Sequence, residues 1–129
     1  MSTKAIICVD DERSILVGLQ QQINQEFGDT FLLEFAQNGD EALEIVESLQ
    51  QENIDIPLLF TDQMMPGMRG HELINHMHSI SPTTKCILLS GYADNDILND
   101  LKNSGFVRII HKPWEKTEII GLVNEICKN

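Results

Sequence analysis

Four short polar segments of the sequence contain side chains that could take part in chemistry, and each begins within two residues of the end of a short apolar run. In chain order they are Asp10-Asp11-Glu12, the segment that begins at Asp62, Ser90-Gly91 and Lys112-Pro113. Carboxylates packed close together repel one another strongly unless a cation lies among them. Oxygen ligands without sulfur or a histidine cluster favour a hard cation, usually Mg²⁺ where phosphate oxygens complete the coordination, with Mn²⁺ as the alternative. The carboxylates therefore predict a divalent metal site.

The same segments also contain the groups that a phosphoryl-accepting site needs. An aspartate can attack phosphorus and form an aspartyl-phosphate. Phosphoryl transfer depends mainly on positioning and on neutralisation of charge, which a metal ion and a lysine can supply. Asp62 is the candidate nucleophile, Ser90 could donate a hydrogen bond to the phosphoryl oxygens, and Lys112 would provide a compact positive charge on a flexible stem.

Each segment taken alone has a simpler explanation. An acidic run after a strand, such as Asp10-Asp11-Glu12, is often the start of a helix, where it interacts favourably with the helix dipole. Asp62 could cap the helix that follows it, and Ser90-Gly91 and Lys112-Pro113 could be plain turns. Their joint occurrence, in this order and each directly after a strand, has no comparably simple structural explanation.

The elements that would position these residues alternate between strand and helix. Five apolar runs too short for helices are expected to be buried strands: Ala5–Val9, Phe31–Ala36, Leu58–Phe60, Cys86–Leu89 and Val107–Ile110. Stretches with helical periodicity lie between them, beginning with residues 14–27 and ending with a fifth helix after Lys112. Asp40 is the expected N-cap of the second helix and Asp94 that of the fourth.

This alternation predicts a doubly wound α/β fold, with a parallel sheet covered by helices on both faces. In such a fold ligands bind beyond the carboxyl ends of the strands, where the strand order reverses. A flavodoxin-like strand order of 2-1-3-4-5 would make the first and third strands neighbours, so their acidic residues would meet. No Gly/Pro-rich linker interrupts the chain, so residues 1–129 are expected to form one domain.

The composition excludes several functional classes. Twenty acidic residues against nine basic ones give a net charge of −11, which repels nucleic-acid backbones, so no direct binding to nucleic acid is expected. No apolar stretch approaches the roughly 20 residues that span a bilayer, and no secretory signal is apparent. A cytoplasmic protein without membrane contact is therefore expected. Three cysteines without a C-x-x-C pair do not suggest a disulfide framework.

The motifs resemble those of the receiver domain of bacterial two-component response regulators. The resemblance extends from residue 4 to about residue 127 and rests on Val9-Asp10-Asp11-Glu12, residues 61–70, Leu89-Ser90-Gly91 and His111-Lys112-Pro113-Trp114. It implies a (βα)5 fold that accepts a phosphoryl group from a phosphohistidine on a sensor histidine kinase or a histidine phosphotransfer protein. It also implies that the domain signals to an output domain or effector protein and is a switch rather than an enzyme.

The resemblance assigns roles residue by residue. Asp62 matches the phosphoacceptor, and Asp10 and Asp11 match the acidic pair that holds Mg²⁺ with help from the backbone carbonyl of Met64. Ser90 matches the hydroxyl switch residue. Lys112 matches the invariant-type lysine of the family.

Three positions qualify the resemblance. Ile109 stands where the family often has an aromatic residue, so a switch based on an aromatic side-chain rotation is not expected here. Met64 and Tyr92 occupy the two places that modulate access to the phosphoryl group. Their bulk suggests restricted access for attacking water.

Two other functions remain as alternatives. An aspartyl-phosphate phosphatase on a similar fold usually has a second Asp two residues after the nucleophile, but Met64 stands there. A flavin-phosphate binder prefers a Ser/Thr/Gly-rich loop after the first strand, whereas Asp10-Asp11-Glu12 would repel a phosphate. The third-helix histidines His71, His76 and His78 have no i, i+4 spacing, so exposed surface positions are expected rather than a zinc site.

The signalling surface is expected at the face formed by helix four, strand five and helix five, because Ser90 and Lys112 precede those two helices. A phosphorylation-dependent dimer through this face is a further expectation. The candidate contact residues are Ile97, Asp100, Lys102, Arg108 and Lys116.

Overall fold

The computed structural model describes residues 3–91 and 106–127. The strands are β1 (Lys4–Val9), β2 (Leu32–Ala36), β3 (Asp55–Asp62), β4 (Lys85–Ser90) and β5 (Phe106–His111). The helices are α1 (Arg13–Phe27), a short 3-10 turn η1 (Gly28–Thr30), α2 (Gly39–Gln51), α3 (Gly70–Ile80) and α5 (Lys116–Cys127). The expected fourth helix, its cap Asp94 and the contact residues Ile97, Asp100 and Lys102 lie outside the described residues.

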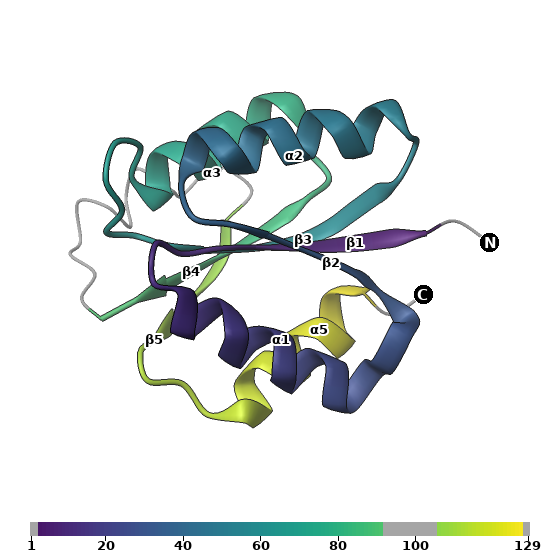
Figure 1. Ribbon diagram of the computed structural model, residues 1–129, viewed down its shortest axis with the longest axis vertical. Coiled ribbons are helices and arrows are strands. Elements are labelled where there is room, and N and C mark those ends of the chain that lie inside the picture. The colour runs from purple at the N-terminus through teal and green to yellow at the C-terminus, as the bar shows by residue number, and fades with distance from the viewer. Residues whose placement is uncertain (1–2, 92–105, 128–129) are drawn as a thin grey trace.

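The five strands form one parallel sheet in the order β2-β1-β3-β4-β5. Helices α2 and α3 cover one face, and α1 and α5 cover the other (Figure 1). The expected doubly wound α/β fold and its strand order are thus confirmed. Within residues 3–91 and 106–127, no helix combines the length and apolarity needed to cross a bilayer.

Alternation along the strands divides the apolar side chains between two cores. In β1, Ala5, Ile7 and Val9 belong to the α2–α3 core, whereas Ile6 and Cys8 belong to the α1–α5 core. All five are fully buried. This is the period of two that a pleated strand imposes, and it explains why a central strand covered on both faces is apolar throughout.

Two local features differ from expectation. The third strand is longer than expected and covers residues 55–62. Between the pairs Lys4–Asp55 and Ile6–Leu58, β3 has one more residue than β1, and this bulge accommodates Pro57, which has no N–H to donate. The cap of α2 is Asn38 rather than Asp40: the Asn38 side chain accepts a hydrogen bond from the amide of Glu41 at 2.8 Å. Asp40 lies instead in the first helical turn, where a carboxylate favours the helix dipole.

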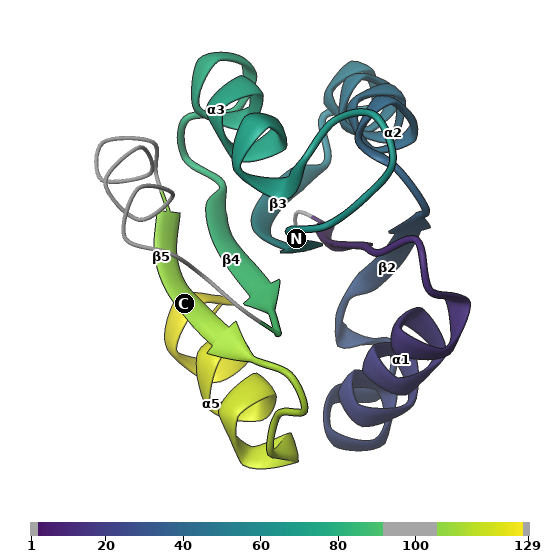
Figure 2. The ribbon, with the colours of Figure 1, turned by 90° about the vertical axis from the view of Figure 1, so that its left-hand side faces the viewer.

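The carboxyl ends of the strands meet along one edge of the sheet, which faces the viewer in Figure 2. Helix α3 begins close to this edge, at Gly70. A Cβ atom added at Gly70 would collide with the backbone carbonyl of Asp62 and lie 2.9 Å from Leu88 Cδ1. Only glycine lets the start of α3 approach β3 this closely.

We therefore expect Gly70→Ala to lower the free energy of unfolding by roughly 1–3 kcal/mol, because the added methyl group must displace backbone rather than a flexible side chain. Gly121→Ala is the matched control. Gly121 lies inside α5 with nothing within 4 Å of an added Cβ, so this change should be neutral or stabilise by up to about 1 kcal/mol. Urea denaturation of both variants measures the difference. Equal stability of the two would contradict the close approach.

Candidate functional site

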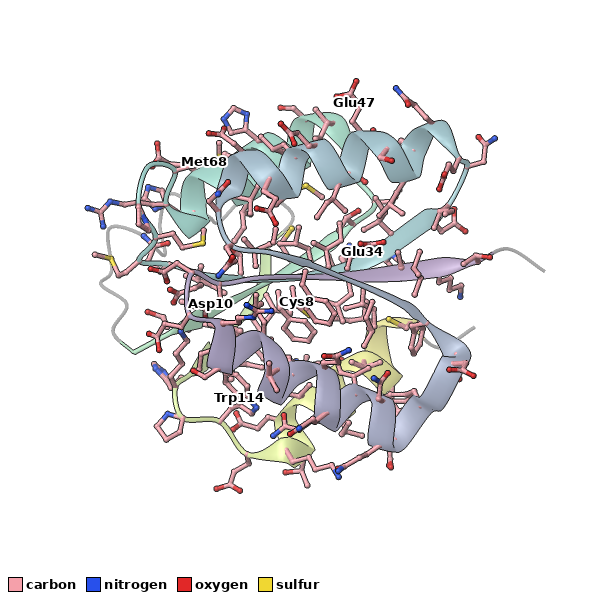
Figure 3. All side chains as sticks on the ribbon, viewed as in Figure 1. Cys8, Asp10, Glu34, Glu47, Met68 and Trp114 are labelled. Atoms are coloured by element: carbon pink, nitrogen blue, oxygen red, sulfur yellow. The ribbon has the colours of Figure 1, made fainter. Side chains whose placement is uncertain are left out.

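Three carboxylates meet where β1 and β3 end. Asp10, Asp11 and Asp62 each place one oxygen so that all three lie within 4.8 Å of one another; we call these residues the acidic cluster. The register of β1 and β3 explains why the carboxylates lie together: Val9 pairs with Thr61, so Asp10 and Asp62 follow side by side at the strand ends. Asp10 has no exposed surface and Asp62 is 6% exposed, whereas Asp11 is exposed. Figure 3 shows Asp10 at this end of the sheet.

Lys112 joins the cluster from the end of β5. Its ammonium nitrogen lies 2.8 Å from Asp10 Oδ2 and 3.0 Å from Asp62 Oδ1, so one cation bridges the two buried carboxylates. The backbone amide of Lys112 donates to the carbonyl of Ser90 at 3.0 Å, which fixes the chain where β5 ends. The sequence-predicted lysine therefore reaches residues 50 and 102 positions earlier in the chain.

Burial and the contacts within the site shift the pKa values of Asp10 and Lys112. Burial raises the pKa of Asp10, and the hydrogen bonds from Lys112 and from the amide of Glu12 offset only part of this effect, while the charge of Asp62 adds to it. For Lys112, burial alone would lower the pKa, but the bonds and charges of Asp10 and Asp62 outweigh it and raise the pKa.

Both pKa values are raised, so both groups make the fold less stable as pH rises, but in different pH ranges. Because the pKa of Asp10 is higher in the folded chain, stability falls as pH rises from about the ordinary value of 3.8 through the raised pKa. The pairing of Lys112 stabilises the fold fully below its ordinary pKa of 10.5, and this contribution is lost as pH rises through the raised pKa. At neutral pH Asp10 therefore costs stability relative to a neutral side chain, even with Lys112 beside it.

Ser90 lies beside the cluster at the end of β4. Asp62 pairs with Leu89 on β4, and Ser90 pairs with His111, the residue before Lys112. Ser90 is 1% exposed. The structure thus brings the predicted hydroxyl to the same edge as the predicted nucleophile and the lysine.

The loop after β3 forms another border of the site. Met64 is 61% exposed, and its sulfur accepts a hydrogen bond from Arg69 Nη1 at 2.9 Å. Met65, by contrast, is buried in the α2–α3 core. Tyr92, the second predicted access residue, lies outside the described residues, so restricted access stays a prediction.

The donor set suits a hard divalent cation. Three carboxylate groups offer oxygen atoms, and the fully buried Asp10 retains a free-energy cost as an anion that a cation would reduce. Mg²⁺ is typically held by one or two carboxylates together with phosphate oxygens and water. The residues that are present therefore fit Mg²⁺.

Sequence reasoning missed a polar pair in the β3–α3 loop. His71 was expected to be an exposed helix residue, but it is half-buried and forms two hydrogen bonds with the side chain of Gln63. His76 and His78 are exposed as expected. Nothing in the spacing of Gln63 and His71, eight residues apart across a loop, distinguishes them from ordinary polar surface residues.

The expected signalling face is described only in its β5 and α5 parts. Arg108 on β5 lies 3.7 Å from Glu125 on α5, and both side chains are exposed. Lys116, also expected on this face, is exposed, and its ammonium donates to Gln25 of α1 at 3.0 Å. Just before α5, Trp114 Nε1 also donates to α1, at Gln22 Oε1, over 2.8 Å. A role of Lys116 in signalling stays a prediction.

Comparison with known proteins supports the same interpretation. Residues 6–124 match the model of the response regulator receiver domain family. Sporulation initiation phosphotransferase F of Bacillus subtilis is 33% identical over 125 residues, covering 97% of this chain and 94% of that protein. The uncharacterised transcriptional regulatory protein YesN of Bacillus subtilis is 35% identical over 94% of this chain, which spans only 32% of that protein.

Solved structures agree with the sequence relatives. A CheY-like response regulator receiver domain protein from Methanospirillum hungatei has a TM-score of 0.83 at 29% identity, with 96% of this chain and 93% of that chain covered. The signal receiver domain of an HD domain-containing protein from Pseudomonas fluorescens has a TM-score of 0.85 at 27% identity, with coverages of 98% and 95%. With the acidic cluster and Lys112 in place, this chain belongs to the response regulator receiver domain family.

Proposed function

We propose that this chain accepts a phosphoryl group on Asp62 and relays the resulting change to an output domain or effector protein. The donor would be a phosphohistidine on a sensor histidine kinase or on a histidine phosphotransfer protein. The observation that carries the proposal is the bridge from Lys112 to Asp10 and Asp62 beside the exposed Asp11. This arrangement places a nucleophile, a cation and a metal-binding group together at one edge of the sheet.

The residues divide the chemistry among themselves. A carboxylate oxygen of Asp62 attacks phosphorus, the new P–O bond forms as the P–N bond to the donor imidazole breaks, and the imidazole keeps the electron pair and takes up a proton. Lys112, already 3.0 Å from Asp62, would neutralise charge that develops on the phosphoryl oxygens. Ser90 would donate a hydrogen bond to one of them. Asp10, Asp11, Asp62 and the carbonyl of Met64 would hold Mg²⁺, which supplies further charge neutralisation when bound.

The expected switch follows from where these groups lie. A phosphoryl group adds about −1.5 to −2 charge and strong acceptor oxygens, which would draw Ser90 and Lys112 toward Asp62. Those residues end β4 and precede α5, so the change would reach the face that includes Arg108. Ile109 packs against the α2–α3 core where the family often has an aromatic residue. Loop and helix displacement, rather than a ring rotation, would therefore carry the signal, and a phosphorylation-dependent dimer could use the same face.

The wider setting of the chain is also part of the proposal. We place it in the cytoplasm as one receiver domain over residues 1–129. Direct contact with nucleic acid is not expected, because the net charge of −11 repels phosphate backbones. Its relatives include a protein named as a phosphotransferase, which this chain covers almost fully, and much longer regulators and a sensor kinase, which it covers in part. Either arrangement is compatible with a phosphoacceptor module.

A phosphatase would need an acid/base group beside the nucleophile. Two residues after Asp62 stands Met64, whose exposed thioether cannot transfer a proton. This favours a switch that promotes its own phosphorylation and dephosphorylation over a phosphatase that acts on other substrates.

The first test is covalent labelling. In Mg²⁺ and acetyl phosphate, the wild-type chain should gain the mass of one phosphoryl group, and Asp62→Asn should gain none because an amide is not a nucleophile toward phosphorus. Asp55→Asn is the matched control, since Asp55 is an exposed aspartate at the other end of the same strand; it should label as wild type does. Intact-mass spectrometry reads the result. Equal labelling of Asp62→Asn and wild type would refute the assignment.

The second test concerns the charge balance of the cluster. Without metal at pH 7, Asp10→Asn should unfold at higher urea than wild type, because the raised pKa of Asp10 means that its ionised form costs stability. The difference should shrink below about pH 4, where both side chains are neutral. With Mg²⁺ at about a hundred times its Kd, wild type should gain about 2.7 kcal/mol, and the variant should gain less.

Asp29→Asn removes the same charge from an exposed position outside the cluster and should behave as wild type. Trp114 fluorescence follows unfolding in all three proteins, since it is the only tryptophan. An Asp10→Asn variant less stable than wild type at pH 7 without metal would contradict the charge balance described above.

A further inference from the structure

Gln63 is a buried polar residue between the predicted phosphoacceptor and a predicted metal ligand. It follows Asp62 directly, precedes Met64 and is 1% exposed. Its amide points to the start of α3: Oε1 accepts from the backbone amide of His71 at 2.9 Å, and Nε2 lies 2.7 Å from His71 Nδ1. Its main-chain carbonyl accepts from the amide of Gly70 at 3.0 Å. One residue thus makes three hydrogen bonds to the first two residues of the helix.

These hydrogen bonds cap the N-terminus of α3. The first amides of a helix have no partner within it, and an arginine at the cap position, here Arg69, has no acceptor in its side chain. Gln63 accepts from the amides of both Gly70 and His71 across a loop. The loop is therefore closed at its base by Gln63, one residue before Met64.

The ring of His71 completes the arrangement. Because Gln63 Oε1 already accepts from the His71 amide, the nitrogen Nε2 of Gln63 faces the ring and can only donate. His71 Nδ1 must then be the acceptor in this hydrogen bond. The ring thus holds the Gln63 amide in the one orientation that caps α3.

We propose that Gln63 and His71 form a positioning pair that fixes the β3–α3 loop so that the carbonyl of Met64 can complete the Mg²⁺ site. The proposal rests on the proposed function, which assigns that carbonyl as a ligand. A backbone ligand has no side chain with which to adjust, so its position depends on the groups that hold its neighbours. Supporting groups of this kind typically change metal affinity by about 10- to 100-fold when they are removed.

The test is Mg²⁺ affinity measured by calorimetry on the unphosphorylated chain. Gln63→Ala removes both side-chain bonds and should raise the Mg²⁺ Kd about tenfold. His71→Leu removes only the ring acceptor and should raise it by a smaller factor. His71→Asn offers an amide oxygen in place of Nδ1 and should restore affinity to about that of wild type.

Gln50→Ala is the matched control for a purely structural effect. Gln50 also bonds to α3, donating to the carbonyl of Ile80 at 2.7 Å, but it does so at the far end of the helix. Its loss should leave the Mg²⁺ Kd within about twofold of wild type even if urea unfolding shows lower stability. His71 is only half-buried, so its variants allow the test even if Gln63→Ala does not fold.

The outcomes distinguish failure of the positioning pair from failure of the Mg²⁺ site itself. Weaker Mg²⁺ binding in Gln63→Ala and His71→Leu, recovered in His71→Asn and absent in Gln50→Ala, supports the positioning pair. Wild-type affinity in both Gln63→Ala and His71→Leu would overturn it and leave the metal site intact. A wild-type chain that binds no Mg²⁺ would overturn the metal site and this inference together.

Discussion

The mutual repulsion of carboxylates at the ends of two neighbouring strands is the constraint on which the rest of the site depends. Asp10 and Asp62 are buried within reach of one another, and Lys112 is placed between them at 2.8 Å and 3.0 Å. The two contacts do not remove the cost, because burial still raises the pKa of Asp10. A site with a residual excess of negative charge is one that a metal ion can stabilise, and a phosphoryl group can then be accommodated beside it.

The fold can support this arrangement because the strands that carry it are fixed from both sides. The ends of β1, β3, β4 and β5 are held in register through the sheet, and the α2–α3 and α1–α5 cores fill the space above and below. Within the described residues, every buried side-chain nitrogen and oxygen has a hydrogen-bond partner. The strands set the distances among the charged groups at their carboxyl ends.

Much of this could be predicted from the sequence because the strong signals are local. Short apolar runs followed by Asp10, Asp62, Ser90 and Lys112 define strand ends, and a parallel sheet necessarily brings such ends to one edge. Prediction failed where the structure depends on long-range or backbone detail. The bulge that admits Pro57 into β3 depends on its partner strand, and the hydrogen bonds of Gln63 to His71 depend on how the loop folds back onto α3. Asn38 and Asp40 are both good caps by type, and only the backbone position decides between them.

The central claim is that the acidic cluster is a metal-dependent phosphoacceptor site. Its most direct test is a crystal structure with Mn²⁺, which gives an anomalous signal, and beryllofluoride, which mimics a phosphoryl group. We predict one anomalous peak among Asp10, Asp11 and Asp62, bound to oxygen ligands that include the carbonyl of Met64, with the beryllium on an oxygen of Asp62. A metal bound elsewhere, or a beryllofluoride that leaves Asp62 free, would contradict the account.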